Sequence, residues 1–356
     1  MSIEIIGPEA EALLTWAGLT EALEAGHRLP RAEIADLFLY RGKDTLLDRA
    51  AWIDGLGALV KVATVFPGNP AQGKPSVNGA VALFDDRDGT LTAMLDFHLV
   101  TRWKTAGDSL LAASKLARKD SRNILLVGAG VVARSMVQAY SSLIPDARFT
   151  VWSRSNAAAM GLPVADDLET AVRAADIICT ATMATEPLIK GSWLQPGQHL
   201  DLIGAYRPDM REVDDAAMER ARIFVDARAT TLHHIGELMA PLASGAIRES
   251  DVIADFHDLA TGSYRRRSRD EITIAKNGGG AHLDLMTATY IAAMWRGALA
   301  RDELWRKPGL VFHRHWRRTK TLAKRSKPAF WFLPDLSHDK SGRACHQPAH
   351  GAGVLR

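Results

Sequence analysis

The sequence predicts an α/β protein in which a doubly wound parallel sheet is joined to a discontinuous α+β domain. From Asn123 onward, short apolar runs alternate with helical stretches, as expected for parallel strands that are buried on both faces. A glycine-rich turn at residues 128–133 stands between one of these runs and a helix. The preceding segment, residues 60–95, is divided by glycine and proline into short strands and turns, which indicates a separate α+β unit.

The first part of the chain is predicted to mix helices and strands. Residues 9–40 have apolar positions at helical spacing and predict a helix. Residues 58–64 and 80–84 are the clearest strands, and the second is followed by the turn signal Asp-Asp-Arg-Asp-Gly. Residues 105–118 have a helix-forming composition and place apolar side chains along one broad face. This helix leads directly into the next domain.

The second part of the chain predicts the parallel sheet. Its strands are the apolar runs NILLV, FTVWS, ADIICTAT, HLDLIGA and RIFVDA. The segment that follows Ser268 ends in a long apolar-rich helix, which could fold back on the first domain. We therefore expect one domain at residues 1–118, completed by about 285–306, and a second domain at residues 119–284.

Composition and charge exclude several classes of protein. The chain is 47% hydrophobic and 24% charged, which is typical of a globular protein. It has neither a bilayer-length apolar run nor a signal pattern, so we expect a cytoplasmic location and no membrane partner. Residues 1–306 are acidic overall, which argues against nucleic-acid binding.

Residues 307–356 are basic and aperiodic and are expected to be a disordered or aberrant extension. Cys179 and Cys345 have no metal-ligand spacing, so no metal site is expected.

The glycine-rich turn matches the dinucleotide fingerprint G-x-G-x-x-A of Rossmann domains. The first glycine permits the tight turn, the second lets the backbone approach a pyrophosphate, and the helix N-terminus supplies N–H groups and a favourable dipole. Such a turn can also be a packing device, but its position between a strand and a helix favours nucleotide binding. The predicted contacts are Gly128, Ala129, Gly130, Val131 and Val132.

The residues after the next strand bear on the choice of nicotinamide cofactor. An NAD enzyme usually has Asp or Glu at this position to bind the ribose 2′-hydroxyl. This chain has Ser153, Arg154 and Ser155 instead, and a guanidinium suits a 2′-phosphate. We therefore expect NADPH to be preferred, with NADH possible. The alternative is that Arg154 is a solvated surface residue.

Two lysines of the first domain are candidate site residues. Lys61 interrupts the apolar run ALVKVATVF, and a buried lysine is costly unless it has an anionic partner or a task. It could instead lie at an edge where its amine reaches water. Lys104 is predicted just before or at a helix start, which is a favourable place for anions. A surface charge beside Arg102 is the alternative.

Together with the fingerprint, several segments resemble the ornithine cyclodeaminase/μ-crystallin family over roughly residues 30–300. They are VKVATVFPGNP, GTLTAMLD, LVTRWKTAGDSLLAASKLAR, VGAGVVA, ADIICTAT and DEITIAKNGGGAHLDL. The resemblance implies that Lys61, as the catalytic residue, and Lys104 hold the substrate carboxylate and imine near the nicotinamide. An upstream arginine also binds the carboxylate; we assign it to Arg41, with Arg49 as the alternative. Further contacts on the cofactor side are implied at Ala181, Thr182, Lys276 and Asn277.

The sequence departs from the family pattern at two positions. Lys104 replaces the usual arginine, which loses the bidentate fork but keeps the charge. Tyr206, in the run DLIGAY, replaces the catalytic aspartate of true ornithine cyclodeaminases. Asp209 could substitute for it only if the loop is remodelled. Without an acid to handle the proton of the attacking amine, ornithine is disfavoured as the substrate.

The resemblance is therefore greatest to the Δ1-pyrroline-2-carboxylate reductases, which lack that aspartate and share a D-E-I-T-x-x-K segment. It implies a homodimer through the first domain, which binds substrate, and a small cyclic imino acid as the ligand. The implied reaction converts Δ1-pyrroline-2-carboxylate to L-proline, or the six-membered Δ1-piperideine-2-carboxylate to L-pipecolate. The alternatives are ornithine cyclodeaminase or alanine dehydrogenase activity, and non-catalytic NADPH or ligand binding as in μ-crystallins.

Overall fold

A computed structural model describes residues 3–306 of the protein. These residues form two sheets, one parallel and one mainly antiparallel. Within that range the parallel sheet has seven strands in the order β12-β11-β13-β10-β9-β7-β8. They are β7 (Asn123–Val127), β8 (Arg148–Trp152), β9 (Ile177–Thr180), β10 (His199–Leu202), β11 (Ala221–Val225), β12 (Val252–Ala254) and β13 (Ile272–Lys276). The five apolar runs that predicted strands form β7 to β11, so the predicted parallel sheet is confirmed.

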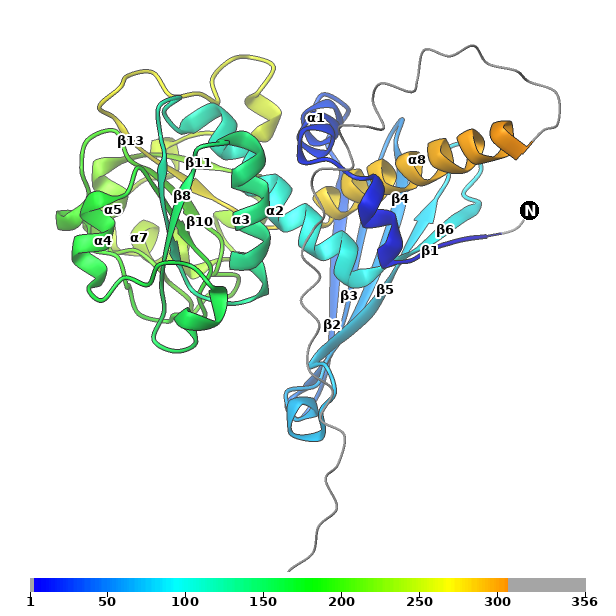
Figure 1. Ribbon diagram of the computed structural model, residues 1–356, viewed down its shortest axis with the longest axis horizontal. Helices are drawn as coiled ribbons and strands as arrows, with labels where there is room; N and C mark the ends of the chain where they lie inside the picture. The colour runs from blue at the N-terminus through cyan, green and yellow to red at the C-terminus, as the bar shows by residue number, and fades with distance from the viewer. Residues whose placement is uncertain (1–2, 307–356) are drawn as a thin grey trace, which may run out of the picture. The chain divides into compact units, whose positions relative to one another are not determined.

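Helices cover both faces of the parallel sheet (Figure 1). Figure 1 shows α3 on one face and α4, α5 and α7 on the other. The helices of this part of the chain, including the short α6, are α3 (Val131–Leu143), α4 (Leu168–Ala174), α5 (Asp215–Arg220), α6 (Arg228–Thr231) and α7 (Gly236–Ser244). Strands β9, β10 and β13 are buried at every residue. Burial on both faces explains why these strands are continuous apolar runs rather than alternating ones.

In the described residues, the second sheet has six strands in the order β1-β6-β5-β4-β3-β2. They are β1 (Glu4–Ile6), β2 (Glu33–Arg41), β3 (Asp44–Ile53), β4 (Gly57–Val65), β5 (Val77–Phe84) and β6 (Leu91–Asp96). Strand β1 is parallel to β6, and the other neighbours are antiparallel. Strand β4 is therefore central, and its buried face alternates through Leu59, Lys61 and Ala63.

Helices α1 (Trp16–Gly26), α2 (Phe97–Leu116) and α8 (Ala281–Arg306) share one hydrophobic core with this sheet. Helix α8 returns from the parallel sheet to the N-terminal part of the chain. The Tyr290 hydroxyl accepts a hydrogen bond from the Thr15 amide at 2.9 Å. A Cβ atom on Gly26 would lie 2.5 Å from the Met286 sulfur, so the two helices approach closely at this glycine. The expected domain boundary at residue 118 falls between α2 and β7.

The prediction of one helix over residues 9–40 is wrong. Helix α1 begins after Thr15, whose hydroxyl accepts a hydrogen bond from the Gly18 amide, and it ends at Gly26. Residues 33–41 form strand β2, which pairs with β3 along its whole length. The apolar spacing in this segment suited a helix, but pairing with a neighbouring strand overrides local preference.

The predicted start of the second helix is also wrong. Helix α2 begins at Phe97 because the Asp96 carboxylate caps it by accepting a hydrogen bond from the Leu99 amide at 2.6 Å. Lys104 therefore lies inside the helix rather than at its start. The favourable dipole at a helix start therefore does not act on Lys104.

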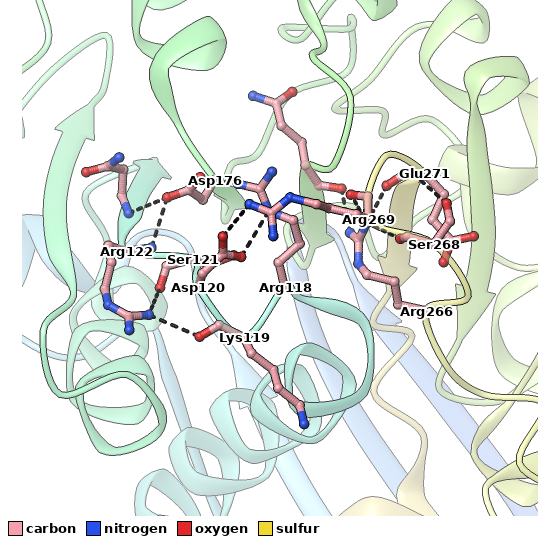
Figure 2. Close-up of polar contacts among 12 residues, drawn as sticks. Arg118, Lys119, Asp120, Ser121, Arg122, Asp176, Arg266, Ser268, Arg269 and Glu271 are labelled. Atoms are coloured by element: carbon pink, nitrogen blue, oxygen red, sulfur yellow. Dashed lines mark hydrogen bonds and ion pairs between the residues drawn. The ribbon is translucent and has the colours of Figure 1, made fainter.

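Charged side chains fasten the link between α2 and β7 to the loop that precedes β13 (Figure 2). Arg266 donates to the carbonyl oxygens of Leu116 at 2.6 Å and Gln198 at 3.0 Å. Arg118 pairs with Asp176 at 2.6 Å. Leu116 ends α2, and Asp176 and Gln198 directly precede β9 and β10, so the network fixes the end of α2 against the parallel sheet.

The predicted basic extension, residues 307–356, lies outside the described residues. Across residues 3–306, no helix combines the length and the apolar character needed to cross a membrane.

Candidate active site

Arg49, Lys61 and Lys104 meet where the second sheet, α2 and α8 pack together. Strand register places Arg49 on β3 directly opposite Lys61 on β4. The side chains of Lys61 and Lys104 are each 7% exposed, and that of Arg49 is 23% exposed. Buried like charges side by side are unfavourable unless anions offset them, so this cluster requires an acid or an anionic ligand.

Asp284, near the start of α8, is the buried counter-ion of the two lysines. Its Oδ1 atom accepts a hydrogen bond from Lys61 Nζ at 2.8 Å, and its Oδ2 atom lies 3.8 Å from Lys104 Nζ. Burial by itself would raise the pKa of Asp284, but Lys104 and Lys61 hold it below the usual value. Burial lowers the pKa of Lys104 to about 8, against the opposing effect of Asp284. Lys61 is thus a buried, paired cation and not an edge residue that reaches water.

A glycine turn after β13 connects the cations to the parallel sheet. The Gly279 carbonyl accepts hydrogen bonds from Lys104 Nζ at 2.5 Å and from Arg49 Nη1 at 2.9 Å. The Gly279 amide donates to Asp226, which follows β11, at 2.7 Å. Gly279 has φ of +69°, and a Cβ atom there would lie 2.8 Å from Lys104 Nζ. The cation cluster therefore borders the carboxyl edge of the parallel sheet, where open α/β sheets bind ligands.

The structure does not bring Arg41 to this cluster. Arg41 ends β2 beside the turn at Gly42, its side chain is 79% exposed, and it pairs with Asp44 at 3.0 Å. Arg49 reaches the cluster, and the Asp36 carboxylate holds its guanidinium at 2.7 Å. Of the two arginines considered, the structure therefore places Arg49, and not Arg41, in the cation cluster. Position along a hairpin decides which side chain reaches a site, and the residue spacing alone did not show where this hairpin turns.

The fingerprint turn has the geometry that a pyrophosphate needs. Gly128 has φ of +115°, and a Cβ atom there would lie 2.5 Å from the Ala181 carbonyl oxygen. Helix α3 follows Gly130, and no side chain caps its N-terminus. A Cβ atom on Gly130 would have nothing within 4 Å, so the space in front of the first amides of α3 is open. Uncapped amides at a helix N-terminus bind anions, and these residues therefore fit a dinucleotide.

The candidate 2′-phosphate residues follow β8, which lies next to β7 in the sheet. The Ser153 hydroxyl donates to the Ser155 carbonyl at 2.6 Å and closes a short turn. Arg154, between them, is exposed, and no carboxylate within residues 3–306 forms an ion pair with it. Its guanidinium is thus available to an anion that binds at this edge.

The remaining predicted cofactor residues lie on the other side of the fingerprint. Ala181 and Thr182 follow β9, and the Ala181 amide donates to the Val127 carbonyl at 2.9 Å. Lys276 is 1% exposed, and its amine donates to the carbonyls of Leu202 at 2.9 Å and Asn277 at 2.7 Å. Two main-chain carbonyl oxygens therefore accept hydrogen bonds from the Lys276 amine. The amine thus supports the ends of β10 and β13 rather than pointing toward a ligand.

The loop after β10 carries Tyr206 and Asp209. Tyr206 is 56% exposed. Asp209 pairs with the exposed Arg207 at 2.9 Å, and this pairing lowers its pKa. The charge of Asp209 is thus compensated at the surface, and the loop is not arranged to place this acid in the cation cluster.

Asp284, Asp226 and Gly279 were not among the site residues predicted from the sequence. Two signals pointed toward them. A run of glycines after a strand indicates a turn with positive φ, and a buried lysine requires an acid. Chain order does not show which acid faces Lys61, because the partner comes from a helix 223 positions further along the chain.

Comparisons with known proteins show the family to which the chain belongs. A model of the ornithine cyclodeaminase/mu-crystallin family matches residues 54–298. The chain is 52% identical over 302 residues to a Delta(1)-pyrroline-2-carboxylate reductase of Paracoccus denitrificans, with 81% of this chain and 96% of that protein covered.

Solved structures show the same fold. The Delta(1)-pyrroline-2-carboxylate reductase of Thermococcus litoralis in complex with NADH and L-proline has a TM-score of 0.75 and 25% identity, covering 83% of this chain and 98% of that one. An archaeal alanine dehydrogenase dimer with bound NAD has a TM-score of 0.75 and 27% identity, covering 85% and 98%. The chain belongs to the ornithine cyclodeaminase/mu-crystallin family, as its motifs predicted.

Proposed function

We propose that this protein reduces Δ1-pyrroline-2-carboxylate to L-proline with a nicotinamide cofactor, NADPH in preference to NADH. The observation that carries the proposal is the cluster of Arg49, Lys61 and Lys104 around Asp284, at the carboxyl edge of a dinucleotide-binding sheet. Such a cluster suits a small anionic substrate. Relatives with the same fold include a reductase bound to NADH and L-proline.

In this proposal the chain binds and orients the imine while the cofactor, when bound, supplies hydride to C2. Arg49 and Lys104 would hold the substrate carboxylate. Lys61 is positioned by Asp284 and by the Phe97 ring, whose centroid lies 4.8 Å from the Lys61 amine, and it would face the imine nitrogen. Orientation and charge neutralisation supply most of the catalysis, because a protonated imine is already electrophilic.

The proton balance gives Lys61 a second task. Hydride addition to the iminium leaves a neutral ring amine, and one proton must reach this nitrogen to form zwitterionic proline. The Lys61 ammonium would donate that proton and recover it from solvent after product release. None of these roles depends on ring size, so reduction of Δ1-piperideine-2-carboxylate to L-pipecolate is expected as well.

The preference for NADPH is supported by Arg154 and by the absence of an acid at the end of β8. A carboxylate there would bind the ribose 2′-hydroxyl and repel a 2′-phosphate, whereas an exposed guanidinium attracts the phosphate. Relatives with the same fold bind NADH or NAD, so the preference is a property that we infer for this chain.

We also expect the protein to act as a homodimer through the second sheet. Strand β2 ends that sheet and exposes Leu37 (53%), Phe38 (47%) and Leu39 (54%), which lie on both of its faces. A long apolar edge strand is a ready site for pairing with another chain. The archaeal relative described above is a dimer. Light scattering after size exclusion should give twice the monomer mass.

The test is a panel of substrates, and turnover of each imine is measured as the decrease in NADPH absorbance. The panel contains Δ1-pyrroline-2-carboxylate, Δ1-piperideine-2-carboxylate and pyruvate with ammonia, and ornithine is tested with NAD. We expect turnover of the pyrroline and none of ornithine, because Tyr206 stands where a cyclase needs an acid and Asp209 is paired at the surface. Ammonia-releasing proline formation from ornithine would overturn the proposal. Tight NADPH binding without turnover of any imine would favour a non-catalytic binding protein.

A further inference from the structure

A buried carboxylate, that of Glu212, joins the loops that follow β9 and β10. Its Oε1 atom accepts hydrogen bonds from the Thr182 amide at 2.9 Å and the Thr182 hydroxyl at 2.7 Å. Its Oε2 atom accepts from the Thr180 hydroxyl and the Gly204 amide, both at 2.7 Å. Glu212 is 0% exposed. These donors all lie at the carboxyl ends of β9 and β10, so one side chain bridges the two strand ends.

Other buried groups hold Glu212 itself in place. The Glu237 carboxylate accepts hydrogen bonds from the amides of Glu212 at 2.7 Å and Val213 at 3.0 Å. Burial lowers the pKa of Lys276, and the nearby Glu212 and Glu237 oppose that shift, so these charges act on one another. Lys276 also donates to the Leu202 carbonyl, at the end of β10. Glu237 and Lys276 therefore hold Glu212 in place on the side away from the two loops, and the loops that Glu212 joins have a defined spacing.

The two loops pack so closely at Gly204 that no side chain fits there. A Cβ atom on Gly204 would lie 2.2 Å from the Thr182 carbonyl oxygen and 2.4 Å from Glu212 Oε1. Met183 and Tyr206, which follow the bridged residues, are 60% and 56% exposed. The bridge thus fixes the base of each loop and leaves its outer side chain open to solvent.

The order of the strands indicates which part of a dinucleotide would cross this bridge. The fingerprint follows β7, and the 2′-phosphate candidate Arg154 follows β8 on one side of it. On the other side lie β9, β10 and β13, and the turn after β13 contacts Lys104. The adenosine half would therefore lie over β8, and the nicotinamide half must pass the ends of β9 and β10 to reach the cation cluster.

We propose that Glu212 is a positioning residue for the cofactor, because its carboxylate sets the spacing of the loops at residues 181–184 and 203–206. The inference rests on the proposed function, since it assumes that a nicotinamide cofactor binds. Loss of the Glu212 bridge should weaken the binding of the nicotinamide half of the cofactor and leave the binding of the adenosine half unchanged.

The experiment compares Glu212→Gln and Thr180→Val with the wild type, because the buried Thr180 hydroxyl donates to Glu212 and Thr180 is not itself a predicted cofactor contact. The glutamine keeps the shape, but its amide nitrogen cannot accept hydrogen bonds, so donors on one side of the bridge lose their acceptor. The valine removes a single hydroxyl donor. Glu219→Gln is the matched control, because Glu219 is exposed on the same stretch of chain. The dissociation constants of NADPH and of 2′,5′-ADP, which lacks the nicotinamide half, are measured by fluorescence or calorimetry, with NADH and 5′-ADP as the second pair.

We expect Glu212→Gln to raise the dissociation constant of the full cofactor by about tenfold or more, as for the loss of a hydrogen bond to a charged group. Thr180→Val should give a smaller rise in the same direction. Binding of the ADP fragment should stay within about twofold for both variants, as should both ligands for Glu219→Gln.

An equal loss for the full cofactor and its ADP fragment would show that Glu212 only supports the fold, and would overturn the inference. Unchanged cofactor binding in both variants would overturn it as well. If Glu212→Gln does not fold, Thr180→Val decides. A split between the two ligands in a protein that reduces no imine would contradict the proposed function and support the positioning role.

Discussion

Lys104 should set the alkaline limit of imine binding. Burial lowers its pKa to about 8, with Asp284 acting in the opposite direction. Above this pH the amine becomes neutral, and the substrate carboxylate loses one of the cations proposed to hold it. A group with a pKa of about 8 is roughly 10% protonated at pH 9, so the KM for the imine should rise about tenfold between pH 7 and pH 9.

This loss of affinity is separate from loss of the fold. The pKa of Lys104 lies below its ordinary value of 10.5, so the unfolded chain binds more protons than the folded chain between about pH 8 and 10.5. The contribution of Lys104 to the free energy of unfolding therefore rises with pH across this window. A thermal midpoint measured at each pH distinguishes weaker binding from unfolding.

Two substitutions should move the limit in different ways. Asp284→Asn removes the carboxylate 3.8 Å from Lys104 Nζ. With an effective dielectric constant of about 20 the lost attraction is on the order of 4 kcal/mol, or at most about three pKa units, and we expect the limit to fall by at least about one unit. Lys104→Arg keeps its charge throughout this range, so the rise in KM should disappear.

The assay is steady-state kinetics with Δ1-pyrroline-2-carboxylate at saturating NADPH, from about pH 6 to about pH 9.5. Ionisation of the imine itself affects every variant equally, so the comparison between variants isolates the protein group. A KM that rises in the same way in the wild type and in Lys104→Arg would refute the reasoning, because the titrating group would then not be Lys104.

Three further substitutions test other parts of the site. Arg154→Asp should invert the ratio of kcat/KM for NADPH over NADH, and an unchanged ratio would show that Arg154 does not bind the phosphate. Lys61→Ala should lower kcat/KM for the imine by about 100-fold or more with the NADPH dissociation constant unchanged, so nearly normal turnover would contradict its role. Gly279→Ala should cost about 1–2 kcal/mol of unfolding free energy in chemical denaturation and raise the KM, since φ is +69° and the new methyl meets Lys104. Gly245→Ala, with φ of +78° and nothing within 4 Å, controls for backbone strain alone and should leave the KM unchanged.

The nucleotide-binding half of the protein could be predicted because its signals are local. Strands such as β7 are buried on both faces and read as continuous apolar runs, which need no knowledge of their neighbours. The fingerprint works through consecutive residues, since Gly128 makes the turn and the amides after Gly130 begin α3. The strand, the turn and the helix start were therefore all present in one short segment of sequence.

The second sheet and its cation cluster were decided by tertiary structure. Residues 33–41 became a strand because β3 pairs with them, and the same hairpin placed Arg49 rather than Arg41 opposite Lys61. The partner of Lys61 is Asp284, 223 positions away on a helix that returns to the first sheet. A lysine in an apolar strand showed that a buried anion was needed, but only strand register and helix packing determine which carboxylate comes within hydrogen-bond distance, because these contacts depend on the folded chain and not on local residue preference.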